Sequence, residues 1–317
     1  MITYAIGLKN RFRGITVREG MLFEGPAGWA EWSPFLDYDD ATCVSWLRAA
    51  REAAVDGWPA PVRNVVPVNC TVPAVGPEKA AEIVRASGCG TAKVKVAEPG
   101  QTLADDLERV EAVRDAIGPG RVRIDANGAW SVDEAVRNLK ELARFDLEYV
   151  EQPCAAVEDL AAVRRRTDVP VAADESIRRA EDPMLVKKLE AADIAVLKVQ
   201  PIGGVRACLD IAEQIGLPVV VSSALETSVG IAAGVALAAA LPELPYACGL
   251  ATVSMFTSEV VAEPLLPVGG FLPVKRLQPD PALLDAARAD ATRTAVWEER
   301  MSRVNELGGV GFEGRLR

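Results

Sequence analysis

Short apolar runs and amphipathic helical stretches alternate along most of this chain. From Val65 onward, eight apolar or β-branched runs recur, and most of them are short, continuous and rich in valine. Runs of that kind are typical of parallel strands that are covered on both faces. We therefore predict strands at Val65–Val72, Ala92–Val96, Val122–Asp125, Leu147–Glu151, Val169–Ala173, Ile194–Val199, Leu217–Ser222 and Tyr246–Leu250.

The segments between these runs carry helix signals. Apolar residues recur at gaps of three or four between Leu103 and Ile117, and Gly118 follows them. A capping-box sequence at 131–134 opens another helix, and the pair Gly203-Gly204 precedes a third. This alternation of strand and helix predicts an α/β fold built on a parallel barrel of the TIM type.

The first 64 residues follow a different pattern. Short β-prone pieces broken by Gly, Pro and Arg, with a loop near Asn10–Gly14, precede a helical stretch over Asp40–Asp56. The β-prone pieces are Met1–Leu8, Ile15–Leu22 and Ala27–Trp32. We expect a small α+β capping domain over 1–64 and a barrel over 65–270. Residues 271–317 are expected to fold back and complete the capping domain, or else to pack on the barrel.

Composition excludes several functions. The net charge of −10 argues against binding to nucleic acid, and no apolar run reaches the roughly 20 residues of a membrane-spanning helix. The N-terminus lacks the pattern of a signal peptide, and the six scattered cysteines form no Cys-x-x-Cys motif. We therefore expect a cytoplasmic protein with neither nucleic-acid nor membrane partners. The pattern leaves monomer and homo-oligomer equally open.

The chain contains no histidine. Neither a Ser-His-Asp nor a Cys-His catalytic arrangement is possible, and no imidazole can bind zinc. A general base in this protein must be Lys, Asp, Glu, Tyr or Cys.

Five charged residues recur at nearly even intervals: Lys95, Asp125, Glu151, Asp174 and Lys198. Their gaps are 30, 26, 23 and 24 residues, and each residue stands at the end of an apolar run. The period matches one strand plus one helix, so we expect all five side chains on one rim of the barrel. Active sites of such barrels lie at the C-terminal ends of the strands.

The three carboxylates of this set have two interpretations. Any one of them alone is most simply a helix N-cap or a turn residue. Together on adjacent strands, about 4.8 Å apart, they would repel one another unless a cation lay between them. Ligation by oxygen atoms alone suits Mg²⁺, with Mn²⁺ also possible. We favour a metal site at Asp125, Glu151 and Asp174.

The lysines also have a second interpretation. Lys93 and Lys95 share one face of their strand, which could be an ordinary solvated face. Inside a barrel they would instead lie close together in a desolvated site, and both effects would lower their pKa values towards that of a useful base. Lys198 lies roughly across the barrel and could form an ion pair with Glu175, which does not exclude catalysis.

Weaker candidates surround this set, and each has a structural alternative. Arg123 either binds a substrate carboxylate or pairs with an acid. Asn127 and Gln152 could orient neighbouring metal ligands. Ser222 and Ser223 could cap the next helix or present N–H groups to an anion. Gly249 either leaves room for a pocket or is a plain turn residue.

The segments around these residues resemble the enolase superfamily. They are Lys93-Val94-Lys95, Asp125-Ala126-Asn127-Gly128-Ala129-Trp130, Glu151-Gln152-Pro153, Asp174-Glu175-Ser176 and Lys198-Val199-Gln200-Pro201-Ile202-Gly203-Gly204. Residues 28–34 are similar to the end of the family's capping sheet. Lysines on the second and sixth strands resemble the muconate lactonizing enzyme subgroup, and the absence of histidine excludes the branches with a His base.

The resemblance implies an α/β fold with a modified (β/α)7β barrel and an N-terminal capping domain. It also implies a site composed of metal ligands Asp125, Glu151 and Asp174, catalytic lysines Lys95 and Lys198, and the auxiliary lysine Lys93.

Within that subgroup, the likeness is greatest to the dehydratases of menaquinone biosynthesis. It rests on the compact length and on the segments 123–125, 222–228 and 248–252. The implied activity is an Mg²⁺-dependent syn-dehydration of a small carboxylate through an enediolate. Racemisation of N-succinylamino acids and muconate-type cycloisomerisation at the same site are the alternatives, and a non-catalytic barrel is a third. Dipeptide epimerases usually carry an Asp-x-Asp pair near the eighth strand, which this chain lacks.

Overall fold

The N-terminal part of the chain forms an antiparallel capping sheet. The computed structural model describes residues 1–179 and 182–311. The capping sheet has the order β1-β2-β3, with β1 at Ile2–Phe12, β2 at Ile15–Gly25 and β3 at Gly28–Trp32. The three strands predicted here are confirmed. The loop expected near Asn10–Gly14 is wrong, because Phe12 still pairs with Ile15 across a two-residue turn. Both turn residues have positive φ, as tight hairpins require.

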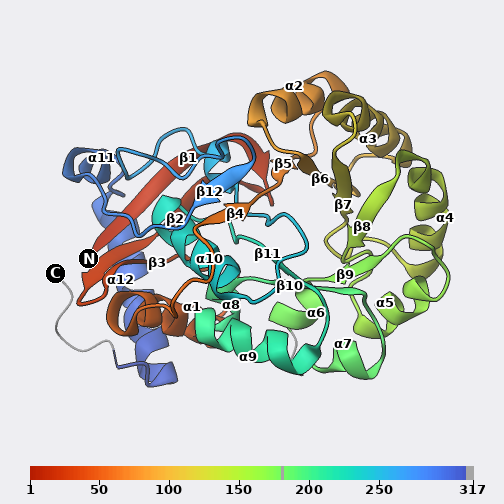
Figure 1. Cartoon of the computed structure of the whole chain (residues 1–317). Coiled ribbons are helices and arrows are strands. Elements are labelled where there is room, and N and C mark those ends of the chain that lie inside the picture. Colours follow the sequence, from red (N-terminus) through yellow and green to blue (C-terminus); the bar gives the residue numbers. More distant parts are fainter. Residues whose placement is uncertain (180–181, 312–317) are drawn as a thin grey trace.

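The barrel sheet is parallel and has seven strands, in the order β5 to β11. Its strands are β5 (Cys70–Val72), β6 (Thr91–Lys95), β7 (Arg121–Asp125), β8 (Leu147–Glu151), β9 (Val171–Ala173), β10 (Ile194–Leu197) and β11 (Val219–Val221). Figure 1 shows this sheet curling inside an arc of helices, with the capping sheet beside it. The predicted α/β fold with a parallel barrel and a capping sheet is confirmed.

Two of the eight predicted strands differ in the structure. The run Val65–Val72 divides into β4 (Val65–Pro67) and β5, and β4 pairs antiparallel with β12 (Phe271–Pro273). Pro67 has no N–H to donate to a continuous ladder, which accounts for the break. The run Tyr246–Leu250 forms only isolated bridges, from Cys248 to Val68 and from Gly249 to Ser222. These bridges close the sheet between β11 and the start of the barrel.

The helices predicted between the strands are present. The stretch Asp40–Asp56 divides into α1 (Asp40–Arg51) and the π-helical turn η1 (Glu52–Asp56). Capping boxes at Thr102 and Ser131 open α3 and α4 as the sequence indicates. The remaining elements are α2 (Pro77–Ser87), α3 (Leu103–Ile117), α4 (Val132–Leu142), η2 (Ala143–Phe145), α5 (Val157–Arg164), α6 (Glu175–Arg178), α7 (Leu185–Lys188), α8 (Val199–Ile202), α9 (Val205–Ile215), α10 (Ser228–Ala240), η3 (Thr252–Met255), α11 (Pro281–Ala286) and α12 (Ala291–Gly308).

Apolar side chains gather in separate clusters for the two parts of the fold. The larger cluster fills the layer between the barrel strands and their helices, and a small separate cluster that includes Tyr149 and Val196 lies inside the barrel. A second cluster joins the capping sheet and α1 to side chains of α11 and α12. There Trp297 of α12 meets Trp32 of β3 edge to face, with ring centroids 5.4 Å apart. Within the described part of the chain, no helix combines the length and apolarity needed to cross a bilayer.

Candidate active site

The predicted rim forms where adjacent strands of the barrel end. Lys95 on β6 pairs in register with Asp125 on β7, and Asp125 pairs with Glu151 on β8. Asp174 and Lys198 directly follow β9 and β10. The three carboxylates are at most 1% exposed. The parallel register therefore brings the five predicted residues to one edge of the sheet, as the spacing indicates.

Each carboxylate of the rim is paired with a cation. Lys93 Nζ lies 3.1 Å from Asp125 Oδ2 and 2.8 Å from Glu151 Oε1. Lys95 Nζ lies 2.5 Å from Asp125 Oδ2, and Lys198 Nζ lies 2.5 Å from an oxygen of Asp174. The alternative in which Lys198 pairs with Glu175 is wrong, because Lys198 pairs with Asp174 and Glu175 pairs with Arg178.

Burial and charge shift the pKa values of these groups in different directions. Burial and the charge of Asp125 raise the pKa of Glu151 to about 7. Burial would also raise the pKa of Asp125, but Lys95 and Lys93 hold it well below its usual range. Burial lowers the pKa of Lys95, as the sequence predicts. The same expectation is wrong for Lys93. Burial would lower its pKa, but the charges of Glu151 and Asp125 raise it above the usual value.

Arg178 is a site residue that the sequence reasoning missed. Its Nε donates to Asp174 Oδ1 at 2.8 Å, and its Nη2 donates to Glu175 Oε1 at 2.5 Å. It also reaches Tyr38 of the capping domain, whose hydroxyl accepts from Arg178 at 3.1 Å and from Arg13 at 2.7 Å. The spacing of four residues from Asp174, one turn of helix, is the signal that could have identified Arg178.

The two amides next to the rim hold their neighbours in place. Asn127 Oδ1 accepts from Lys95 Nζ at 2.6 Å, and its backbone N–H donates to Asp125 Oδ1 at 3.0 Å. Gln152 Oε1 accepts from the backbone N–H groups of Asp174 and Ser176 at 3.0 and 3.2 Å. Asn127 lines the pocket. Gln152 does not line it and holds the turn after β9 through these two hydrogen bonds. Both amides thus act on the rim residues as the sequence suggests.

Arg123 lies away from the pocket. It is fully buried, its Nε donates to Glu148 Oε2 at 2.5 Å, and its Nη1 donates to Asn69 Oδ1 at 3.1 Å. Its guanidinium also lies over the ring of Tyr149, 4.7 Å from the centroid. Pairing with an acid is therefore the alternative that the structure supports, and substrate binding by Arg123 stays a prediction.

The predicted serines and glycine form one wall of the pocket. The N–H groups of Ser222 and Ser223 donate to the carbonyls of Leu197 and Gly249, so they are not free for an anion. Thr227 stands at the N-cap of α10, so neither serine caps that helix. A Cβ on Gly249 would lie 2.6 Å from Ser222 Oγ, so any larger residue there would force the Ser222 side chain to move. The capping and N–H alternatives for the serines are therefore wrong. Ser222, Ser223 and Gly249 all line the pocket, and their part in substrate binding stays a prediction.

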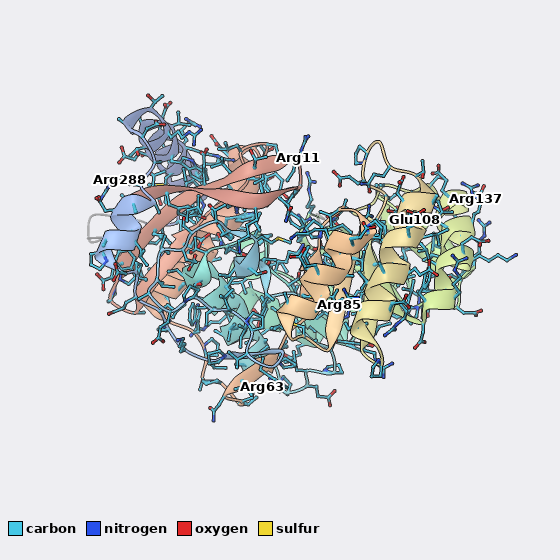
Figure 2. All side chains as sticks on the ribbon, turned by 90° about the horizontal axis from the view of Figure 1, so that it is seen from above. Arg11, Arg63, Arg85, Glu108, Arg137 and Arg288 are labelled. Carbon is cyan, nitrogen blue, oxygen red and sulfur yellow. The ribbon has the colours of Figure 1, made fainter. Side chains whose placement is uncertain are left out.

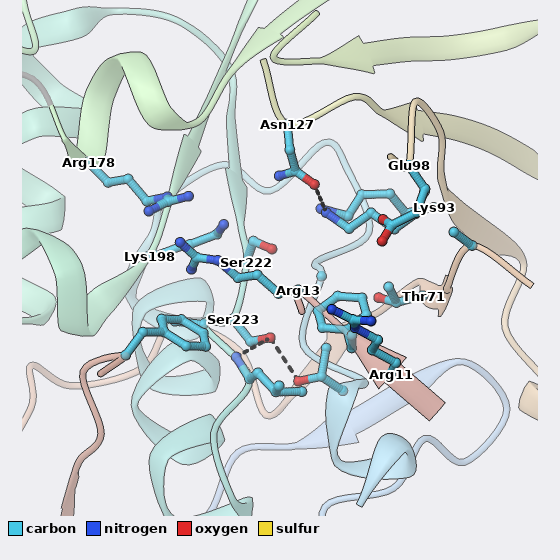
Figure 3. Close-up of a pocket in the computed structure, with 18 of the residues that line it drawn as sticks. Arg11, Arg13, Thr71, Lys93, Glu98, Asn127, Arg178, Lys198, Ser222 and Ser223 are labelled. Atoms are coloured by element: carbon cyan, nitrogen blue, oxygen red, sulfur yellow. Dashed lines mark hydrogen bonds between the residues drawn. The ribbon is translucent and has the colours of Figure 1, made fainter. Parts of the chain in front are cut away.

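A cavity of about 220 Å³ lies over the rim. Figure 3 shows Lys93 and Lys198 on opposite sides of it, with Arg178 beside Lys198. The capping domain covers the cavity with residues that the sequence reasoning did not identify: Arg11, Phe12, Arg13, Phe35 and Trp46. Figure 2 shows Arg11 at the far end of the long hairpin formed by β1 and β2. Basic residues flanking an aromatic residue at a hairpin turn are the signal that could have identified this set.

The rim offers donors that suit a hard cation. Lys93 Nζ already lies between carboxylate oxygens of Asp125 and Glu151, and the donors are all oxygen atoms, as Mg²⁺ prefers. Among the described residues, the buried Glu175 Oε2 has no hydrogen-bond partner. In the same part of the chain, no three acidic or cysteine side chains are grouped closely enough to hold a metal ion as they stand. The residue types fit a cation, and the ligand set itself stays a prediction.

Comparison with known proteins agrees with this fold. Residues 3–54 match the model of the enolase N-terminal domain-like family, and residues 77–279 match that of the enolase C-terminal domain-like family. The muconate lactonizing enzyme from Pseudomonas fluorescens, complexed with muconolactone, superposes with a TM-score of 0.79 at 21% identity, covering 91% of this chain and 97% of its own. The dipeptide epimerase from Enterococcus faecalis, complexed with Mg and a dipeptide, has a TM-score of 0.74 at 23% identity, covering 87% and 96%.

The chain therefore belongs to the enolase superfamily. The o-succinylbenzoate synthase of Thermobifida fusca is 65% identical over 300 residues, which cover 94% of each chain. Within the superfamily, this similarity places the chain in the o-succinylbenzoate synthase family.

Proposed function

We propose that this protein acts as an o-succinylbenzoate synthase, a carbon–oxygen lyase of menaquinone biosynthesis. Its substrate would be 2-succinyl-6-hydroxy-2,4-cyclohexadiene-1-carboxylate, which loses water by syn elimination. The observation that supports this reaction is the pair of lysines, Lys95 and Lys198, each ion-paired with a buried carboxylate and separated by three intervening strands. Such a pair can act on a substrate bound between them.

Lys95 is the acid and base in this proposal. Burial lowers its pKa, which favours the neutral amine that a base requires. The amine takes the proton α to the ring carboxylate, and the C–H electron pair enters an enediolate. The resulting ammonium returns that proton to the hydroxyl on the same face, the C–O bond breaks, and water leaves. The ring becomes aromatic, which drives the reaction forward.

Lys198 contributes its positive charge. An ammonium on the far side of the pocket stabilises the negative charge that develops on the enediolate, and such preorganised charge is usually the largest catalytic contribution. Asp174 holds Lys198 in place at 2.5 Å, and Arg178 holds Asp174 from the other side at 2.8 Å. The auxiliary Lys93 lies between Asp125 and Glu151, and its positive charge offsets the repulsion between those carboxylates.

We assign the metal of this reaction to Asp125, Glu151 and Asp174. When bound there, Mg²⁺ would polarise the substrate carboxylate and so acidify its α-proton. The dipeptide epimerase from Enterococcus faecalis, which has a similar fold, is complexed with Mg, and this supports the choice of cation. Each of the three residues ends a strand or follows one directly, so the backbone fixes where a cation would lie.

The charge of the pocket suits a substrate with two carboxylates. Five basic residues line it besides Lys93, whereas Glu98 is the acidic residue on its surface among the residues described. The basic set consists of Arg11, Arg13, Lys95, Arg178 and Lys198. We assign the ring carboxylate to the rim, and the succinyl carboxylate to the arginines of the capping hairpin. Phe12, Phe35 and Trp46 supply the apolar surface for the ring and the methylene groups.

The decisive experiment mixes the purified protein with that cyclohexadiene carboxylate and Mg²⁺ and follows the absorbance of aromatisation. We expect conversion that EDTA abolishes, with kcat/KM above about 10⁴ M⁻¹s⁻¹, the lower end for working enzymes. Slow conversion that EDTA leaves unchanged would contradict the assignment.

A second candidate is the racemisation of N-succinylamino acids. Lys95 and Lys198 line one pocket from strands that three others separate, so each could serve as a base for one enantiomer, which is the observation that favours it. Exchange of the α-hydrogen in D₂O with both enantiomers would support this activity. Exchange with neither enantiomer would exclude it.

A further inference from the structure

Arg18 is a buried arginine of β2 that connects the capping domain to the barrel. It is 2% exposed, and its Nε donates to the carbonyl of Leu225 at 2.8 Å. Its Nη2 donates to the carbonyls of Ala224, at 3.3 Å, and Ser33. The guanidinium also lies over the ring of Phe35, 4.3 Å from the centroid. Arg18 itself does not line the pocket, whereas Phe35, Ala224 and Leu225 do.

The backbone at Leu225 needs support. Its φ of 64° lies in the left-handed region, which is costly for a branched side chain. Such conformations persist only where the surroundings hold them, and they gather at functional sites. The N–H of Leu225 donates to Ser223 Oγ at 3.4 Å, and the Ser223 hydroxyl is 2.8 Å from that of Thr252, as the dashed lines in Figure 3 show. On the carbonyl side, Arg18 is the partner.

Two buried carboxylates, those of Glu226 and Glu31, accept hydrogen bonds from the backbone on either side of Leu225. Glu226 Oε2 accepts from the N–H of Ala224 at 2.7 Å. Glu31 Oε2 accepts from the N–H groups of Thr227 and Gly230, at 3.0 and 3.2 Å, where α10 begins. Both carboxylates are at most 4% exposed. Arg18 supplies positive charge beside them, so one cation stabilises both the carbonyls and the acids of this wall.

We propose that Arg18 is a positioning residue for this reaction. It holds Ala224 and Leu225 in the conformation that completes the substrate pocket, and it fixes the ring of Phe35 on the opposite side of its guanidinium. The inference rests on the proposed function, since it concerns how the dehydratase substrate is gripped. It extends that function by assigning control of substrate affinity to a residue that does not touch the substrate.

Arginine suits this task better than lysine. Its planar guanidinium donates several hydrogen bonds in a fixed geometry and stacks on an aromatic ring at the same time. A lysine ammonium retains the charge and reaches a single carbonyl, without the stacking. Arg18→Lys should therefore restore part of what Arg18→Met loses, and the difference between them isolates the geometric role from the charge.

The test compares Arg18→Met, Arg18→Lys and wild type in steady-state kinetics, at a temperature where circular dichroism shows all of them folded. For Arg18→Met we expect kcat/KM to fall on the order of 10²-fold, mainly through a higher KM, since small misplacements of a site are that costly. Arg18→Lys should lie between. Arg276→Met is the matched control, because Arg276 also donates to a carbonyl, that of Ala53 at 3.0 Å, and stacks over Trp58 at 4.0 Å, away from this pocket.

Wild-type KM in Arg18→Lys, together with wild-type KM in any folded Arg18→Met, would overturn the proposal, even if both variants melt earlier. A crystal structure of Arg18→Lys gives a readout that needs no substrate. We expect Leu225 to leave the positive-φ region there, and an unchanged Leu225 would count against the proposal. If the wild type fails to dehydrate the cyclohexadiene carboxylate, the proposed function fails, while the conformation of Leu225 still decides the role of Arg18.

Discussion

Lys93 and Lys95 leave β6 two residues apart, yet their pKa values shift in opposite directions. Lys93 lies between two carboxylates, whose charges outweigh the cost of burial. Lys95 makes its closest contacts with one carboxylate and with the neutral amide of Asn127, so burial prevails. Of the two lysines on this strand, Lys93 thus stays a cation and Lys95 is the candidate base. Opposite pKa shifts of this kind allow neighbouring groups to take different roles in proton transfer.

Replacing Lys95 by alanine tests that separation. We expect Lys95→Ala to keep its fold and its Mg²⁺ affinity, because the three carboxylates remain, while turnover falls by at least 10²–10⁴-fold, about the worth of a general acid–base group. Calorimetry with Mg²⁺ and the aromatisation assay give the two values. Lys79→Ala, at an exposed ion pair on α2, is the matched control and should keep full activity. Near-normal turnover of Lys95→Ala would reject its role.

Glu226 makes stability depend on pH. Burial, reinforced by Glu31, raises its pKa from 4.5 to about 7 despite the charge of Arg18. The folded protein therefore binds a proton more tightly than the unfolded chain. The resulting stabilisation is complete below pH 4.5 and is lost as pH rises to about 7, amounting to about 3 kcal/mol.

Glu226→Gln should flatten this dependence. The amide oxygen can still accept the N–H of Ala224, and no charge has to be buried at high pH. Urea unfolding at pH 5 and pH 8 measures the difference, which we expect to be smaller in Glu226→Gln than in wild type. Glu243→Gln, at an exposed position, should behave like wild type. An unchanged slope in Glu226→Gln would show that the neighbouring acids carry the effect.

At the scale of elements, the hairpin of β1 and β2 in the capping domain brings positive charge to the pocket. Arg11 lies exposed at its end and lines the pocket. For Arg11→Gln we expect KM to rise by up to about fivefold, the size of one exposed charge contact, with little change in kcat. Added salt should shrink the difference, since exposed charges are screened. Lys9→Gln on the same strand, whose lysine bonds the carbonyl of Ser254, is the control and should leave KM unchanged.

The strand ends of the barrel could be predicted because they obey a local rule. A charged residue that closes an apolar run, repeated at the period of one strand and one helix, identifies Asp125, Glu151 and Lys198 without knowledge of the fold. Arg11 and Arg18 obey no such rule, since their contacts with the pocket depend on how the capping sheet docks. Leu225 and its carbonyl are 207 residues from Arg18 in sequence, and no pattern within either segment indicates the contact.

Local patterns also failed to predict which of two neighbouring acids, Asp174 or Glu175, pairs with Lys198. The sequence offered Glu175 as a possible partner of Lys198, whereas Lys198 pairs with Asp174, because that choice depends on the turn after β9. Gln152 fixes this turn by accepting two N–H groups, and Arg178 then occupies Glu175. The eighth strand was overestimated, because the run Tyr246–Leu250 pairs only through the isolated bridges of Cys248 with Val68 and of Gly249 with Ser222.

At the scale of the whole molecule, we propose that α11 and α12 complete the capping domain, whose core then depends on the C-terminal helix. Of the segment 271–317 expected to do so, β12 pairs with β4 instead, and residues 312–317 lie outside the described residues. Trp297 of α12 is 1% exposed, meets Trp32 edge to face and donates from Nε1 to Glu19 Oε2 at 3.0 Å. These contacts join the last long helix to the first sheet, and Trp297 does not line the pocket over the rim. Removing them should weaken the fold and leave the chemistry intact.

We expect Trp297→Ala to lower the free energy of unfolding by about 3–5 kcal/mol, the usual loss for a large buried aromatic side chain. Because Trp297 does not line the pocket, KM and kcat should stay near wild type at temperatures where the variant is folded. Urea unfolding and the aromatisation assay measure the two quantities. Val296→Ala, exposed on the same helix, should change neither. A loss below about 1 kcal/mol for Trp297→Ala would mean that α12 only rests on the capping sheet, since burial of the indole would then contribute far less than a core side chain does.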